Sequence, residues 1–315
     1  MQQERPIVTI RCITYNQEKY IRQCLDGFIM QKTNFKFEAI VHDDASTDST
    51  ANIIREYAQR YPNIIKPILE TENQYSKGTL HNVLDPLMTG KYIAICEGDD
   101  YWTDQYKLQK QVDFLESNPS YFMCFHQSIR HFENHSHPDE LAVDIEDRDY
   151  SGLELYSPLH RPQTHSVLFR SELYRSEIYH RIEQEKISFG DLTTFLACAY
   201  LGKVRGMTDV MGVYRQHQTS MSSTVFSSSA PNEKVLKFAK DNLKLYKIFG
   251  KEYKEECTKI YVMDYFNFFM NSLHCGKYRF DILIKVLFTH PIYTILFLID
   301  RYNWHKASNK KKETV

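Results

Sequence analysis

The 315-residue chain lacks the features that mark several classes of protein. Its seven cysteines are odd in number and include no CxxC pair, so neither a zinc site nor a redox motif is expected. The formal net charge is -1, which gives no reason to expect nucleic acid as a partner. No GxGxxG motif follows the first β-branched run, which argues against a Rossmann dehydrogenase.

An export signal is also missing from the start of the sequence. Residues 1–6 carry neither the basic start nor the apolar stretch of a signal peptide. The cysteines are widely spaced and lie mostly in apolar runs, as expected of reduced thiols in a protein core. These observations together predict a cytoplasmic protein.

A strongly apolar stretch near the C-terminus, residues 282–299, is interrupted by Lys285, His290 and Pro291. It falls short of the roughly 20 clean apolar residues that a membrane-spanning helix needs. Because residues 301–312 are basic, the stretch suits a helix at an anionic membrane surface. A helix packed on the rest of the chain, or on a second subunit of a homo-oligomer, fits equally well. The sequence therefore predicts peripheral contact with the inner face of a membrane as one of two alternatives.

What is present indicates a globular α/β protein. Apolar residues make up 42% of the chain and aromatic residues 14%, far from a disordered composition. In the first hundred residues, short β-branched runs alternate with amphipathic helical stretches, a pattern typical of βαβ units and a mostly parallel sheet. Strands are expected at residues 7–13, 37–41, 64–69, 92–96 and 167–170. Asn16 is expected to cap the first helix.

Polar residues cluster where the predicted strands end. Residues 14–16 follow the first strand, Asp43 and Asp44 follow the second, and residues 97–100 follow a later one. In open α/β sheets, ligands bind outside the carboxyl ends of the strands. The sequence therefore predicts a single polar site built from three loops.

The adjacent acids Asp99 and Asp100 are the strongest single feature of that site. Two neighbouring carboxylates at a loop edge repel each other unless a cation or hydrogen-bond donors neutralise them. Mg²⁺ and Mn²⁺ prefer oxygen ligands and are often held by one or two carboxylates together with substrate phosphates. A solvated acidic turn that caps the next helix explains the pair equally well, so the pair alone leaves both interpretations open.

Three segments taken together resemble a known family. They are Thr14-Tyr15-Asn16, Asp43-Asp44-Ala45-Ser46-Thr47-Asp48 and Gly98-Asp99-Asp100-Tyr101-Trp102. In this order and spacing they are similar to the family 2 inverting glycosyltransferases with the GT-A fold, over roughly residues 5 to 220. The resemblance implies a nucleotide-binding half at residues 1–104 and an acceptor half at residues 105–221. A Ser-rich linker at 222–232 and a helical region at 233–315 would follow.

The resemblance also implies roles for individual residues. The nucleotide-sugar pocket would be lined by Thr14, Tyr15, Asn16, Asp43, Asp44 and Asp99. Asp44 would hydrogen-bond the uracil, Asp99 would lie near the ribose, and Asp100 would bind the metal that bridges the diphosphate. One departure is Ala45, where the family frequently has glycine. An acidic cluster favoured by a helix dipole is the alternative interpretation of Asp43 and Asp44.

Asp191 is the candidate catalytic base. Family members usually place this Asp in an acidic pair at a helix start, whereas here Gly190 precedes it. An inverting transfer needs a carboxylate that takes the proton of the acceptor hydroxyl. The metal stabilises the charge that develops on the leaving diphosphate. A simple N-cap of the following helix is the alternative role for Asp191.

His217 lies in a segment, residues 214–220, that resembles the family segment whose histidine reaches the metal or diphosphate. Imidazole suits Mn²⁺ better than Mg²⁺, although a solvated loop histidine is an equally common outcome. Arg215 is interpreted either as a phosphate partner or as half of a surface ion pair. For Trp102, packing in the core is favoured over stacking on a sugar.

The resemblance thus implies a Mn²⁺- or Mg²⁺-dependent transfer of a sugar from a UDP-sugar to a glycan or lipid-linked saccharide, in surface polysaccharide synthesis. A nucleotidyltransferase also places acids at strand ends. It usually has a glycine-rich basic loop near the first strand, which residues 14–20 lack. A non-catalytic binding module of the same fold is the other alternative, because the partner acid of Asp191 is absent.

Overall fold

The computed structural model describes residues 5–218, 220 and 232–299. The chain divides into two compact units, one of residues 1–180 with 191–217 and the other of residues 181–190 with 218–315. Most of the predicted Ser-rich linker, residues 222–231, lies outside the described residues.

The first unit is built on one mixed sheet. Its strands are β1 (Val8–Thr14), β2 (Phe37–Asp43), β3 (Ile65–Leu69), β4 (Tyr92–Ile95), β5 (Tyr101–Trp102), β6 (Tyr121–Phe132), β7 (Glu140–Leu141), β8 (Leu168–Arg170) and β9 (Lys203–Gln216). They form a nine-stranded sheet in the order β3-β2-β1-β4-β8-β6-β9-β5, with β7 paired to β6. The predicted strands are therefore present, with bounds shifted by one or two residues.

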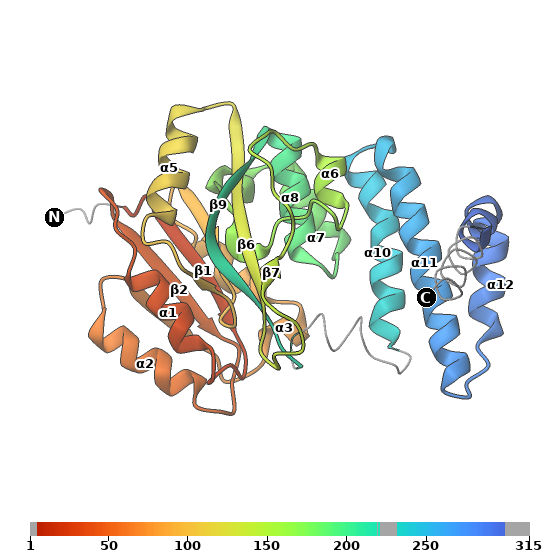
Figure 1. Cartoon of the computed structure of the whole chain (residues 1–315), viewed down its shortest axis with the longest axis horizontal. Helices are drawn as coiled ribbons and strands as arrows, with labels where there is room; N and C mark the ends of the chain where they lie inside the picture. The colour runs from red at the N-terminus through yellow and green to blue at the C-terminus, as the bar shows by residue number, and fades with distance from the viewer. Residues whose placement is uncertain (1–4, 219, 221–231, 300–315) are drawn as a thin grey trace. The chain divides into compact units, whose positions relative to one another are not determined.

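Pairing is parallel from β3 through β2 and β1 to β4, as the alternating pattern predicts. Beyond β4 the sheet is mixed, because β8 runs antiparallel to β4 and β6, and β5 runs antiparallel to β9. The long strands β6 and β9 lie parallel and side by side (Figure 1). The prediction of a mostly parallel sheet thus describes the first half, where strands and helices alternate.

The helices up to residue 201 are α1 (Ile21–Ile29), α2 (Thr50–Arg60), α3 (Gln74–Lys77), α4 (Leu80–Leu84), α5 (Lys107–Ser117), α6 (Gly152–Tyr156), α7 (Glu177–Glu185) and α8 (Gly190–Leu201). Helices α1, α2 and α5 share one apolar core with the parallel strands. On α1 the buried side chains recur at helical spacing, as predicted, at Ile21, Cys24, Leu25 and Phe28. This packing holds the carboxyl ends of β1, β2 and β4 in fixed positions.

The expectation that Asn16 caps the first helix is wrong. Helix α1 begins at Ile21, and Tyr20 occupies its cap position. Asn16 instead adopts a left-handed backbone conformation with φ of 53°. Its side-chain oxygen accepts the backbone N–H of Thr47 at 2.8 Å, so it joins two loops instead of capping a helix.

The second unit is helical, as the C-terminal pattern predicts. It contains α10 (Glu233–Phe249), α11 (Lys254–His274), α12 (Phe280–Thr289) and a further helical segment, Pro291–Ile299. An aromatic face of α11, with Tyr261, Tyr265, Phe268 and Phe269, packs into a core with α10 and α12. In the described part of the chain, no single helix is long and apolar enough to cross a membrane. Helix α12 and the segment Pro291–Ile299 reach the length and apolar composition of a membrane span only when taken together, and they are bent by 112° relative to each other.

None of the seven cysteines, all of which lie within the described residues, forms a disulfide. Six are buried, as expected of core thiols, and Cys275 is exposed.

Candidate active site

The three polar loops converge, as the sequence predicts. The backbone N–H of Asp44 donates to the carbonyl of Thr14 at 3.0 Å, and that of Gly98 donates to the carbonyl of Ile13 at 3.0 Å. A Cβ atom at Gly98 would lie 2.5 Å from Gln17 Oε1 and 2.7 Å from Thr14 Oγ1. Glycine is therefore required here, because the loop after β4 passes directly against the loop after β1.

The loops after β1 and β2 are fastened by reciprocal hydrogen bonds. Besides the bond from Thr47 to Asn16, the backbone N–H of Asn16 donates to Ser46 Oγ at 2.8 Å. Thr14 is buried, and its hydroxyl contacts Gln17 Oε1 at 2.7 Å, whereas Tyr15 is 48% exposed. Of residues 14–16, Tyr15 and Asn16 are thus exposed, and the side-chain oxygen of Asn16 is already bonded to Thr47.

Asp43 and Asp44 are both buried, and both carboxylates accept backbone N–H groups. Asp43 accepts the N–H and the hydroxyl of Ser46, and burial raises the pKa of its carboxyl. The two oxygens of Asp44 accept the N–H groups of Gln74 at 2.6 Å and Tyr75 at 3.1 Å. Asp44 therefore ties the loop after β2 to the start of α3.

The second acidic pair has a different environment. Asp99 Oδ2 lies 3.0 Å from His217 Nε2, and both side chains are largely buried. Asp100 is 4% exposed, and its carboxylate accepts the backbone N–H of Arg215 at 2.8 Å and contacts His165 Nδ1 at 3.1 Å. The sequence assigned His217 and Asp100 to a metal. In the structure His217 contacts Asp99, whereas the buried carboxylate of Asp100 is bonded to Arg215 and His165.

Three acids in four residues place a large negative charge in this turn. Burial, together with the charges of Asp100 and Asp99, raises the pKa of Glu97 to about 8. Burial and the charge of Asp99 also raise the pKa of Asp100. Like charges this close disfavour full ionisation, so the site gains stability from any added positive charge.

Arg215 connects several segments of the site through its guanidinium group. Its guanidinium donates to the Asp99 carbonyl at 2.7 Å, to Gln23 Oε1 at 2.7 Å and to the carboxylate of Glu133. The rings of Tyr20 and Tyr101 lie on it, each with its centroid 4.9 Å from the guanidinium carbon. Because Arg215 is buried, the interpretation as half of a surface ion pair is wrong.

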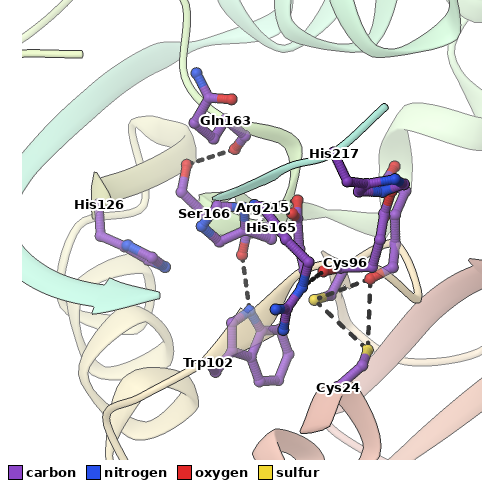
Figure 2. A network of polar contacts seen from close by, with 12 residues as sticks. Cys24, Cys96, Trp102, His126, Gln163, His165, Ser166, Arg215 and His217 are labelled. Carbon is purple, nitrogen blue, oxygen red and sulfur yellow. Dashed lines mark hydrogen bonds and ion pairs between the residues drawn. The ribbon is translucent and has the colours of Figure 1, made fainter. Parts of the chain in front are cut away.

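The buried residue His165 contacts the carboxylate of Asp100, and it was not predicted from the sequence as part of the site. It is completely buried, and its carbonyl accepts Trp102 Nε1 at 2.8 Å (Figure 2). Burial and the nearby charge of Lys107 lower the pKa of His165 to about 3, so the imidazole is neutral. The available signal was a polar Thr-His-Ser segment, residues 164–166, directly before an apolar strand. Core packing of Trp102 is confirmed.

Lys107 was also missed. Its side chain is completely buried, and its ammonium lies 3.9 Å from the centroid of the Trp102 ring. Among the described residues, Lys107 Nζ has no hydrogen-bond partner. Burial lowers the pKa of Lys107 to about 7. The only sequence signal was a lysine at the start of an amphipathic helix, where a solvated position is usual.

Asp191 lies at the start of α8 with an exposed side chain. The helix begins at Gly190, so Asp191 is inside the first turn and not at the cap position. Its charge helps to raise the pKa of Tyr75, whose raised value is caused mainly by burial. Because Tyr75 also donates its backbone N–H to Asp44, Asp191 is near the Asp44 side of the site.

A family model described as "Glycosyl transferase family 2" matches residues 9–182. The chain belongs to this family and is therefore a glycosyltransferase.

Two relatives illustrate the range of similarity. An uncharacterized protein of Mycobacterium tuberculosis is 39% identical over 210 residues, which cover 67% of this chain and 59% of that protein. A poly(ribitol-phosphate) beta-glucosyltransferase of Bacillus spizizenii is 34% identical over 114 residues, covering 36% of this chain and 18% of the relative. The chain thus matches about 59% of the length of the first curated relatives.

Two solved structures share the fold. Staphylococcus aureus TarS 1-349 in complex with UDP-GlcNAc aligns with a TM-score of 0.58 at 16% identity, over 84% of this chain and 74% of that one. A mannosyltransferase of Pyrobaculum calidifontis in complex with GDP-Man and Mn²⁺ aligns with a TM-score of 0.56 at 18% identity, over 96% and 81%. The predicted GT-A fold with C-terminal helices is thereby confirmed.

Proposed function

We propose that this glycosyltransferase moves a sugar from a UDP-sugar to a hydroxyl of a glycan or lipid-linked saccharide, with inversion, in polysaccharide biosynthesis. The contact between Asp99 and His217, at the carboxyl end of β4, carries the proposal. The poly(ribitol-phosphate) beta-glucosyltransferase of Bacillus spizizenii and the TarS complex with UDP-GlcNAc support the acceptor and donor classes.

The side chains of Asp99 and His217 fit the requirements of a divalent metal. A carboxylate oxygen and an imidazole nitrogen at 3.0 Å have the spacing of two adjacent ligands of one octahedral ion with bonds of about 2.1 Å. Mn²⁺ accepts both ligand types, and the acid-rich turn favours a cation. Asp99 and His217 would hold the ion, which when bound neutralises charge on the leaving diphosphate. This proposal moves the metal contact from Asp100, the sequence-based assignment, to Asp99.

Asp100 then acts on the metal site indirectly. Its two hydrogen-bond partners, Arg215 N–H and His165, fix the position of the turn that carries Asp99. Arg215 fixes the same turn a second time through the carbonyl of Asp99. A ligand whose own carbonyl and whose following residue are both held loses little conformational entropy when the ion binds.

Asp191 is the proposed base. Its exposed carboxylate is free to accept the proton of the acceptor hydroxyl. The hydroxyl oxygen forms a bond to the anomeric carbon of the donor, and the bond from that carbon to the diphosphate oxygen breaks. Attack opposite the leaving group inverts the anomeric configuration.

Calorimetric titration of UDP, with and without Mn²⁺, tests the donor site on three proteins. Wild type is expected to bind UDP in a Mn²⁺-dependent manner, and Asp99→Asn to lose that dependence. Asp113→Asn, an exposed acid on α5, is the matched control and should bind as wild type does. A titration with GDP tests whether the site prefers UDP to GDP. Absence of Mn²⁺-dependent UDP binding in wild type, or its persistence in Asp99→Asn, overturns the metal assignment.

Turnover tests the base separately. With a UDP-sugar and acceptor that wild type uses, Asp191→Asn should lower the rate about 100-fold or more while leaving UDP affinity unchanged. Nucleotide binding without turnover of any UDP-sugar would instead favour a binding module of the same fold.

A further inference from the structure

The second unit exposes an unusual amount of apolar side chain. Of the twenty large apolar residues that are exposed in the described part of the chain, half lie within residues 278–299. Phe288 is 84% exposed and Ile292 is 69% exposed. Scattered exposed apolar residues need no explanation, but a concentration of this kind marks an interaction surface.

The exposed residues form regular stripes. On α12, Phe280, Ile284, Leu287 and Phe288 recur at the spacing of one helix face, whereas the core-facing positions are Ile282 and Val286. Each helical segment therefore has two apolar faces, of which the fold covers one.

The segment Pro291–Ile299 repeats this arrangement. Ile292, Ile295, Leu296 and Ile299 are exposed and share one face, while Thr294 is buried. We call these two exposed stripes together the apolar surface of residues 280–299.

The geometry favours a surface that lies along a bilayer over one that crosses it. The two segments hold ten and nine residues, so each is about 15 Å long, half the hydrocarbon thickness of a bilayer. They are bent by 112° relative to each other. Short amphipathic helices of this kind insert their apolar faces at the boundary between head groups and acyl chains.

Charge favours an anionic lipid surface in particular. Residues 277–315 contain eight Lys and Arg residues against three Asp and Glu, whereas the remainder of the chain holds 31 basic and 37 acidic residues. Lys310, Lys311 and Lys312 lie in the sequence that follows the apolar surface. Such clusters beside an amphipathic helix are attracted to anionic lipids. Two copies of the chain joined through this surface would bring like charges together, which disfavours a second copy as the occupant.

We propose that the apolar surface of residues 280–299 docks on an anionic lipid bilayer, to which the basic charge of residues 277–315 attracts it. The proposal does not depend on the identity of the donor or acceptor. It is independent of the metal site, so each can fail without the other.

Vesicle flotation tests the proposal with the full-length protein. Vesicles of phosphatidylcholine alone are compared with vesicles that also contain phosphatidylglycerol. The test variant is Phe288→Asp combined with Ile292→Asp, and the matched control is Leu159→Asp, a leucine 76% exposed in the other unit. Circular dichroism and UDP titration confirm that each variant is folded. A third variant replaces Lys310, Lys311 and Lys312 with glutamine.

Wild type and Leu159→Asp are expected to float with the anionic vesicles. The double variant Phe288→Asp with Ile292→Asp should bind vesicles at least about tenfold more weakly than wild type. The glutamine variant should lose the preference for anionic lipid. Wild type that floats with neither vesicle type overturns the proposal, as does a folded Asp variant that floats like wild type. Light scattering that shows a dimer broken by the Asp variant, without flotation, assigns the surface to a second copy.

Discussion

Two acidic pairs follow strands of the same sheet, and their surroundings differ. Asp43 is held by the N–H and hydroxyl of Ser46, three positions away, and Asp44 by two backbone N–H groups that lie 30 and 31 positions away. Asp99 and Asp100 are satisfied by groups 65 to 118 positions away, including two histidine side chains. The pair after β2 is thus held by Ser46 and by backbone N–H groups, whereas the pair after β4 also contacts two histidine side chains.

This difference indicates that Asp44 has a structural role, whereas Asp99 can exchange its contact with His217 for a contact with a cation. The groups that hold Asp44 are the backbone N–H groups of Gln74 and Tyr75. His217 contacts Asp99 in a turn where three carboxyl groups are crowded together, so we expect a cation to replace the direct contact between them. The comparison predicts that substitutions at the two pairs affect different quantities, namely stability at the first and metal-dependent binding at the second.

The largest effect is expected at His165. His165→Leu removes a hydrogen-bond partner of Asp100 and should weaken Mn²⁺-dependent UDP binding about 10- to 100-fold, the usual cost of losing an outer-shell contact. His165→Asn places an amide near the position of Nδ1 and should retain most of the affinity. Calorimetry measures both.

His126→Leu is the matched control for His165→Leu. His126 is buried beside His165, with ring centroids 5.9 Å apart, but its ring nitrogen contacts the carbonyl of Gln127. The control should therefore leave Mn²⁺-dependent UDP affinity near that of wild type. Equal losses in His165→Leu and His165→Asn would show that the site needs only the imidazole volume, and the positioning role of His165 would fail.

Asp44→Asn should act mainly on stability. An amide has one acceptor oxygen, so one of the N–H groups of Gln74 and Tyr75 would face an NH₂ group. The expected loss is about 1–3 kcal/mol in the free energy of unfolding, measured by urea denaturation. Asp99→Asn is the comparison variant and should lose less than about 1 kcal/mol, because the Asp99 side chain, 18% exposed, is less buried than Asp44. A smaller loss for Asp44→Asn than for Asp99→Asn would break the distinction between the pairs.

The same contrast explains what could be predicted from the sequence. Strands, helices and the convergence of the loops follow from local periodicity and from the geometry of parallel sheets. The partners of Asp99 and Asp100 could not be predicted, because they arise where β9 and the segment before β8 meet the turn after β4. The burial of Arg215 was not predicted for the same reason, since its guanidinium lies against Tyr20, beside α1, and Tyr101, on β5.

Lys107 offers a test through pH. Its folded-state pKa of about 7 lies below the usual value near 10.4, so between these values the folded protein binds fewer protons than the unfolded chain. The destabilisation is complete below about pH 7 and is lost as the pH rises toward 10.4. Lys107→Met should therefore raise the free energy of unfolding by about 1–2 kcal/mol at pH 7, and the gain should shrink at pH 9.

Urea denaturation at both pH values measures this difference. The matched control is Lys110→Met, because Lys110 is exposed and pairs with Asp104 and Asp209. That substitution should change stability by less than about 1 kcal/mol at either pH. An equal gain for Lys107→Met at pH 7 and pH 9 would mean that packing, and not the buried ammonium, sets the effect.

The smallest expected effect is at Ala45, in the turn of the backbone-satisfied pair. Its φ of 64° is in the left-handed region, where a Cβ atom is unfavourable and where the family frequently has glycine. Ala45→Gly should raise the free energy of unfolding by about 0.5–1 kcal/mol, after the greater entropy of glycine in the unfolded chain is included. Ala58→Gly in α2 is the control and should lower it by about 1 kcal/mol. Because the turn is held by Ser46, Gln74 and Tyr75 in either variant, Mn²⁺-dependent UDP affinity should not change; a change in affinity would show that this turn, too, responds to the ligand.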